Sequence, residues 1–164
     1  MSQPPTLLIV WHSRTGTARA MAQAAADAAR AEGEVRMLAA DEAHPEDLLA
    51  ASGYLFVCPE NLASMTGAMK EFFDQSYYPL LGRIEGRPYA AMVAAGSDGA
   101  GAVRQIERIS TGWRLKRIAE SLIVCTHAQT PEQIAAPKLP DEAALARCGE
   151  LGAMIGAGLA MGIF

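Results

Sequence analysis

The sequence predicts an α/β fold in which a parallel sheet of five strands, in the order 2-1-3-4-5, has helices on both faces. Three observations predict the parallel sheet, and the order 2-1-3-4-5 is the one expected for about five strands in such a fold. Five short apolar segments alternate with segments of helical character, hairpin signals are absent between them, and the first apolar segment is continuous. Continuous apolar strands are typical of parallel sheets that are covered on both faces, and parallel neighbours need helical crossovers. With 164 residues, the chain is expected to form one domain over residues 1–164.

The first half of the chain contains three of these strands. Their short length and β-branched residues favour strands over buried helices, and we expect them at 6–12, 34–38 and 53–58. The alanine-rich segment 18–33 predicts a helix that ends at a Gly33 cap. Residues 44–52 predict a short helix with Pro45 in its first turn.

The second half continues the alternation. A helix is expected over 66–78, with Met69, Phe72 and Phe73 on one face. Further elements are expected as a strand at 87–96, a helix at 101–113, a strand at 121–126, a loop around Pro131 and Pro137, and a final helix with Asp141 as its N-cap. In this topology ligands bind at the carboxyl ends of the strands, between strands one and three.

Composition excludes several classes of function. The net charge is −4 with both signs interspersed, so the chain lacks the clustered basic surface of nucleic-acid-binding proteins. Three separated cysteines, Cys58, Cys125 and Cys148, show no metal-ligand spacing and are expected to be buried and reduced in the cytoplasm. No signal peptide is expected in MSQPPT, and the apolar window 151–164 is too short to span a bilayer, which predicts a core helix without membrane insertion.

Residues Ser13–Thr17, called here the phosphate loop, follow the first strand and precede the first helix. Ser13, Thr15 and Thr17 offer hydroxyls, Gly16 permits a tight turn, and the helix that follows offers unpaired N–H groups. This combination is typical of a phosphate site. Neither the Walker pattern nor the dinucleotide GxGxxG pattern is present. The alternative is a helix cap without a ligand, and Arg14 either neutralises the phosphate or points to solvent.

The strand, SRTGT loop and helix together resemble the flavodoxin superfamily, which binds flavin mononucleotide (FMN) without metal. The stretch CPENLASMTGAMKEFFDQS is similar to a segment of FMN-dependent NAD(P)H:quinone reductases of the tryptophan-repressor-binding-protein type and of NADPH-dependent FMN reductases. The matching positions are Pro59, Gly67, Met69, Lys70, Phe72, Phe73 and Asp74. The resemblance implies a flavodoxin-like three-layer sandwich.

The resemblance also implies a site that is shared by three loops. Backbone groups of Glu60–Met65 would bind the pyrimidine edge of the flavin ring while Leu62 or Met65 packs on it. The loop around Gly96–Gly99 would close over one edge of the flavin, with Ser97 and Asp98 as candidates for polar contacts. The alternative for Asp98 is an outward-pointing side chain, because a carboxylate next to the reduced ring would disfavour its anionic form. The expected cofactor-binding residues are Ser13, Arg14, Thr15, Gly16, Thr17, Ala18, Pro59, Glu60, Asn61, Leu62, Ala63, Ser64, Met65, Gly96, Ser97, Asp98 and Gly99. No catalytic side chain is expected, because the flavin carries the chemistry. No metal ligand is expected, because the histidines and cysteines lack metal-ligand spacing.

The implied activity is transfer of hydride from NAD(P)H to FMN and reduction of a quinone or similar small-molecule acceptor. Electron-carrier flavodoxins usually stack aromatic residues on the ring, but neither flavin loop here contains one, so one ring face is expected to be open to substrate. A flavodoxin-type electron carrier without NAD(P)H activity is the main alternative, and a domain that has lost flavin is another. Small residues in the last helix (Gly149, Gly152, Ala153, Gly156 and Ala160) are expected to pack on the sheet, with a homo-oligomer contact as the alternative.

Overall fold

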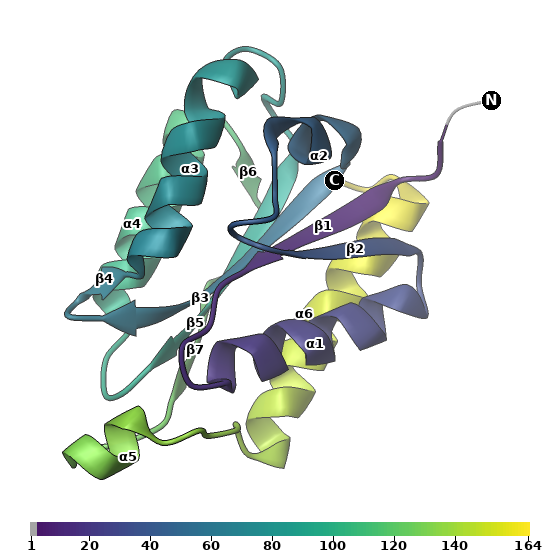
Figure 1. Cartoon of the computed structure of the whole chain (residues 1–164). Coiled ribbons are helices and arrows are strands. Elements are labelled where there is room, and N and C mark those ends of the chain that lie inside the picture. The colour runs from purple at the N-terminus through teal and green to yellow at the C-terminus, as the bar shows by residue number, and fades with distance from the viewer. Residues whose placement is uncertain (1–2) are drawn as a thin grey trace.

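The computed structural model describes residues 3–164 as a sheet between two layers of helices (Figure 1). Met1 and Ser2, which begin the stretch considered for a signal peptide, lie outside the described residues. The parallel strands are β2 (Glu34–Ala39), β1 (Thr6–Trp11), β3 (Gly53–Asn61) and β5 (Pro88–Ala95), followed by β6 (Lys116–Arg117) and β7 (Leu122–Cys125), which both pair with β5. The predicted fold class and strand order are therefore confirmed.

The register brings the carboxyl ends of the strands to one edge of the sheet. Trp11 at the end of β1 pairs with Val57 of β3, and Ala95 at the end of β5 pairs with Cys125 of β7. Since the loops after these strands leave from the same edge, residues far apart in the sequence meet there.

Helices cover both faces of the sheet, as predicted (Figure 1). The first layer contains α1 (Thr17–Arg30) and α6 (Glu142–Met161), and the second contains α2 (Pro45–Ala50), α3 (Gly67–Leu80) and α4 (Ala100–Gly112). Asp141 is the N-cap of α6, as expected, and its side chain accepts a hydrogen bond from the Ala144 N–H at 2.8 Å.

Aromatic side chains form the core beneath α3 and α4. Phe56 of β3 lies 5.0 Å from Phe73 and 6.4 Å from Trp113 between ring centroids, both in edge-on geometry. Met69, Phe72 and Phe73 are all buried on one face of α3, which confirms the helical spacing predicted for them.

Several local features differ from the sequence-based prediction, and one of them is the two-residue strand β6, which was not expected. Strand β3 continues to Asn61 and turns back as the short antiparallel strand β4 (Ser64–Met65), and a short helix α5 (Pro131–Ala135) interrupts the expected proline-rich loop. Helix α1 ends at Arg30. Gly33 is not left-handed, and its N–H donates to the Ala29 carbonyl in the turn that follows the helix.

The last helix extends beyond the apolar window 151–164, because it begins at Glu142, directly after the predicted N-cap. By length and composition α6 is the one helix among residues 3–164 that would suffice to cross a membrane, with a mean hydropathy of 1.2 over 18 residues.

The glycines of α6 pack mainly on α1 and not on the sheet. Gly152 lies against the backbone of Ala25, and Gly156 lies against Ala29. Small residues on both helices therefore permit a close contact within the chain.

Replacing Gly152 with alanine is expected to lower the free energy of unfolding by about 1–3 kcal/mol. A Cβ at this position would lie 2.7 Å from the Ala25 carbonyl carbon, so one helix backbone must shift. Gly149→Ala is the matched control. Its Cβ would lie 3.7 Å from the Ala28 side chain, and helix propensity favours alanine by about 1 kcal/mol. Urea unfolding of the two variants measures the difference, and equal midpoints would contradict the packing.

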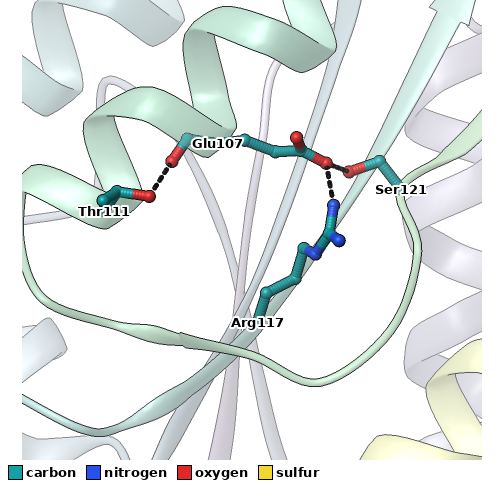
Figure 2. A network of polar contacts seen from close by, with 4 residues as sticks. All are labelled: Glu107, Thr111, Arg117 and Ser121. Atoms are coloured by element: carbon teal, nitrogen blue, oxygen red, sulfur yellow. Dashed lines mark hydrogen bonds and ion pairs between the residues drawn. The ribbon is translucent and has the colours of Figure 1, made fainter.

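Helix α4 is also bound to β6 and to the segment that follows it (Figure 2). The Glu107 carboxylate accepts from the Arg117 guanidinium at 2.7 Å and from the Ser121 hydroxyl at 2.9 Å, while the Thr111 hydroxyl donates to the Glu107 carbonyl. These contacts hold this edge of the sheet against the helix whose N-terminus points toward the site described next.

Candidate functional site

A cavity of about 500 Å³ lies at the carboxyl ends of the strands. Four segments line it: the β1–α1 loop, the end of β3, the end of β5 and the segment that follows β7. The lining residues are Ser13, Arg14, Thr15, Thr17, Ala18, Pro59, Glu60, Asn61, Leu62, Ala94, Ala95, Gly96, Thr126, Ala128, Ile134 and Lys138. The first three segments are those that the sequence predicts, whereas the fourth was not anticipated.

The phosphate loop forms one end of this cavity. Gly16 is the N-cap residue of α1 with a φ of 108°, a conformation that favours glycine, and its N–H donates to the Ser13 hydroxyl at 3.1 Å. Within the described chain no side chain caps the N-terminus of α1 and no acidic residue lies in its first turn. Free N–H groups and the positive end of the helix dipole therefore remain for an anion. The Arg14 side chain lines the cavity and is also exposed to solvent.

The second wall is a hairpin formed by residues 60–65. Glu60 pairs with Met65 and Asn61 with Ser64, while Leu62 and Ala63 have φ values of 54° and 63°. Positive φ at both central residues is typical of a type I′ turn. The tip places Leu62, which is fully exposed, in the cavity lining.

Residues 63–65 of the hairpin lie outside the cavity lining. Met65 is buried in the core beneath α3, so its side chain is not available to pack on a ring. Its N–H donates to the Gln105 amide oxygen of α4 at 2.7 Å, and the Ser64 hydroxyl bonds the same amide. Ala63, Ser64 and Met65 do not line the cavity.

Glu60 connects the second loop to the third. Its carboxylate accepts from the Gly99 N–H at 2.9 Å and from the Ala102 N–H at 3.0 Å, at the N-terminus of α4. A carboxylate in this position is favoured by the helix dipole. The Glu60 side chain thus holds the hairpin and the 96–99 loop in a fixed relation.

The third loop contributes mainly its first residue. Gly96 lines the cavity, whereas Ser97, Asp98 and Gly99 do not. The exposed Asp98 carboxylate accepts from the Ala100 N–H at 3.1 Å, and Gly99 is the N-cap residue of α4 with a φ of 94°. These residues shape the turn next to the cavity.

The fourth segment, residues 126–141, is called here the strap. It leaves β7, forms α5 and crosses the phosphate loop before α6 begins. The capping box of α5, in which Thr130 and Gln133 bond each other's backbone, is visible in the sequence as TPEQ. No local sequence pattern predicts that Ile134 and Lys138 line the cavity. The strap is positioned there by hydrogen bonds to the phosphate loop, more than one hundred residues earlier in the sequence.

The histidine next to the phosphate loop already has a protein partner. His12 Nδ1 lies 2.7 Å from the Thr66 hydroxyl, and the ring is not among the cavity-lining residues. Burial, reinforced by the positive charge of Arg14, lowers the pKa of His12, which favours the neutral ring at pH 7.

The cysteines correct one expectation. Cys58 and Cys148 are buried as predicted, but Cys125 is half-buried and lines a second cavity of about 530 Å³ beside the strap. Burial raises the pKa of Cys58 to about 12 and that of Cys148 to about 11.

Within residues 3–164, no group of three or more His, Cys, Asp or Glu side chains is placed to hold a metal ion.

Titration of the native protein with a disulfide reagent should therefore detect one rapidly reacting thiol, that of Cys125. The thiolate is the reactive form, and Cys58 and Cys148 are both inaccessible and strongly protonated. Unfolding in guanidinium should release all three thiols. In Cys125→Ser the rapid phase should vanish, and a persistent rapid phase would contradict the assignment.

A protein-family model described as Flavodoxin matches residues 9–136. A flavodoxin of Aquifex aeolicus (strain VF5) is 38% identical over 97 residues, covering 58% of this chain and 52% of that protein. An NAD(P)H dehydrogenase (quinone) of Deinococcus radiodurans is 52% identical over 50 residues, covering 30% of this chain and 25% of that protein. The chain thus aligns with about half of the first curated relative and a quarter of the second.

Solved structures support the same fold. The structure of a flavodoxin, WrbA-like protein from Agrobacterium tumefaciens superimposes with a TM-score of 0.78 at 14% identity, covering 96% of this chain and 98% of that one. At this identity the similarity shows the arrangement of helices and strands alone.

Proposed function

Since this chain belongs to the flavodoxin family, whose members bind FMN, we propose that it holds FMN non-covalently in the 500 Å³ cavity and uses it as an NAD(P)H oxidoreductase. The electron acceptor is a quinone or a similar small molecule. The observation that carries this proposal is the cavity itself, whose lining combines the phosphate loop with apolar residues such as Leu62 and Ile134.

The residues present fit FMN. The volume is in the range of about 300–1,000 Å³ that is usual for cofactor sites. The hydroxyls of Ser13 and Thr15 and the free N-terminus of α1 suit a phosphate. Leu62 and Ile134 line the cavity although they are 100% and 56% exposed, and a flat apolar ring would shield both from water.

Backbone strain at the hairpin tip also favours a ligand. A residue other than glycine in the left-handed region costs about 1–2 kcal/mol, and Leu62 and Ala63 both adopt it. The Leu62 side chain is fully exposed, so no burial of apolar surface within the chain offsets this backbone cost. Contact with the flavin would supply such compensation.

In this proposal the protein binds and orients. The phosphate loop would hold the phosphate and Asn61 and Leu62 would contact the ring, while Glu60 keeps the hairpin and the 96–99 loop together. When bound, FMN supplies hydride acceptance and electron transfer. No side chain of the cavity is assigned an acid or base role.

The absence of an aromatic side chain favours an enzyme. Among the described residues, those that line the cavity include no Phe, Tyr or Trp. Tyr77 and Tyr78 stack on each other at the far end of α3 and lie outside this lining. One ring face would therefore remain open to nicotinamide or quinone. The similarity to an NAD(P)H dehydrogenase (quinone) over 50 residues supports the same reading.

An electron carrier without NAD(P)H activity is the second candidate. It is supported by the similarity to the Aquifex aeolicus flavodoxin, which covers 97 residues. Anaerobic mixing of the FMN-loaded protein with NADH or NADPH separates the two candidates. We expect the visible flavin absorbance to bleach and to return on addition of a quinone. Bleaching only with a separate reductase would favour the carrier.

Binding is tested first, by quenching of FMN fluorescence. We expect saturable binding, and Thr15→Ala should weaken FMN more than riboflavin, because only FMN carries the phosphate. A chain that binds no FMN would overturn both redox functions and favour a domain that has lost flavin. Thr17 is a less suitable probe, since its hydroxyl already donates to the Lys138 carbonyl at 3.2 Å.

The setting proposed for this activity is the cytoplasm, without nucleic-acid partners or membrane insertion. Three free cysteines, a net charge of −4 and the packing of α6 on α1 support it. A homo-oligomer would need a surface other than Gly152 and Gly156, because α1 covers these glycines.

A further inference from the structure

The strap is fixed to the phosphate loop through the backbone of Lys138. The Lys138 N–H donates to the Thr15 carbonyl at 2.9 Å, and the Thr17 hydroxyl donates to the Lys138 carbonyl at 3.2 Å. A Cβ on Gly16 would lie 3.3 Å from the same carbonyl. The position of Lys138 over the loop therefore does not depend on its side chain.

The Lys138 side chain turns back to the phosphate loop. Its ammonium donates to the carbonyls of Ile134 and Ala136, each at 2.8 Å, and to the Thr15 hydroxyl at 3.3 Å. All three acceptors are uncharged. Over the part of the chain that the structure describes, no carboxylate pairs with Lys138. Its positive charge thus remains uncompensated at a cavity that Lys138 also lines.

The contact with Thr15 has a consequence for hydrogen bonding. A hydroxyl has one proton to donate and accepts through its lone pairs. Because the Thr15 oxygen accepts from the ammonium, its own proton is directed away from Lys138. Thr15 is itself a lining residue, so this proton is available to an acceptor in the cavity.

We infer that Lys138 is a positioning residue for the phosphate of the cofactor. It orients the Thr15 hydroxyl as a donor and adds a positive charge to the anion-binding end of the cavity. This inference rests on the proposed FMN function and assigns to the strap a role that the phosphate loop alone does not supply. Two hydrogen bonds in series, from an ammonium to a hydroxyl and from that hydroxyl to a phosphate, are stronger than the same pair of bonds between uncharged groups.

The test compares Lys138→Met with the wild-type chain for FMN and for riboflavin. Methionine keeps the unbranched stem and leaves both backbone contacts in place. We expect FMN affinity to fall about 10- to 100-fold and riboflavin affinity to stay within about twofold. The salt dependence of FMN binding should also decrease, because one charge is lost. Lys138→Arg should restore most of the FMN affinity, and Lys138→Gln should behave like Lys138→Met.

Lys116→Met is the matched control, since Lys116 is exposed on β6 and outside the cavity lining. Its affinity for FMN should equal that of the wild-type chain. Thermal unfolding of each variant verifies the fold. Unchanged FMN affinity in Lys138→Met, or an equal loss for riboflavin, would overturn the inference while leaving the proposed function in place. A wild-type chain that binds no FMN would overturn the proposed function itself.

A double-mutant cycle tests the route through Thr15. In a Thr15→Val background the hydroxyl is gone, so Lys138→Met should weaken FMN by several-fold less than it does in the wild-type chain. Full additivity of the two substitutions would overturn the positioning role of Lys138.

Discussion

Replacing Gly101 with alanine should weaken FMN binding by about 100-fold and lower the free energy of unfolding by about 1–3 kcal/mol. Gly101 lies in the first turn of α4, directly beneath the tip of the hairpin. A Cβ there would overlap the Ala63 carbonyl oxygen and lie 2.9 Å from its carbon. Both atoms belong to the backbone, so the hairpin must move and take Leu62 with it.

Fluorescence titration with FMN and urea unfolding measure the two effects. Gly67→Ala is the matched control. Gly67 begins α3 just after the same hairpin, and a Cβ at this position would meet nothing within 4 Å. Its FMN affinity should match that of the wild-type chain. Equal behaviour of the two variants would show that the hairpin does not form a wall of the binding site.

Replacing Glu60 with alanine should lower the free energy of unfolding by about 2–4 kcal/mol, because two charge-assisted hydrogen bonds at the N-terminus of α4 are lost. FMN affinity should fall as well, since the hairpin and the 96–99 loop are no longer held together. Glu60→Gln keeps one carbonyl oxygen as an acceptor, so its loss should be smaller.

Glu71→Ala provides the reference for removing a carboxylate. Glu71 is exposed on α3, and its side chain accepts a hydrogen bond from the Gln75 amide at 2.8 Å, so the change in stability should stay within about 0.5 kcal/mol. Chemical unfolding compares the three variants. A Glu60→Ala variant as stable as Glu71→Ala would refute the role assigned to this carboxylate.

The sequence was sufficient to predict the strands and helices, because the signals for them are local, and the strand order then followed as the one expected for about five parallel strands. Continuous apolar segments such as 6–12 mark strands buried on both faces, and the spacing of Met69, Phe72 and Phe73 marks one helix face. Parallel strands then require their carboxyl ends at one edge. The phosphate loop, the end of β3 and Gly96 could therefore be assigned to one site before any contact was known.

The hairpin turn at Leu62 and Ala63 was not predicted from the sequence, because these residue types do not indicate such a turn. A type I′ turn is normally signalled by Asn or Gly, whereas Leu62 and Ala63 occupy it here with φ values of 54° and 63°. The pairing of β3 with β4 and the bonds from Gln105 to Ser64 and Met65 impose this conformation. Tertiary contacts outweighed local preference at this position.

By itself, then, the sequence determined the sheet, its helical layers and the position of the phosphate loop, because hydrophobic periodicity and turn chemistry act over a few residues. Only the tertiary structure decided what closes the cavity. Lys138 reaches Thr15 across 123 positions of the chain, and Glu60 reaches Gly99 across 39. Such contacts depend on the directions in which whole strands and helices leave the sheet, and no short segment of sequence encodes those directions.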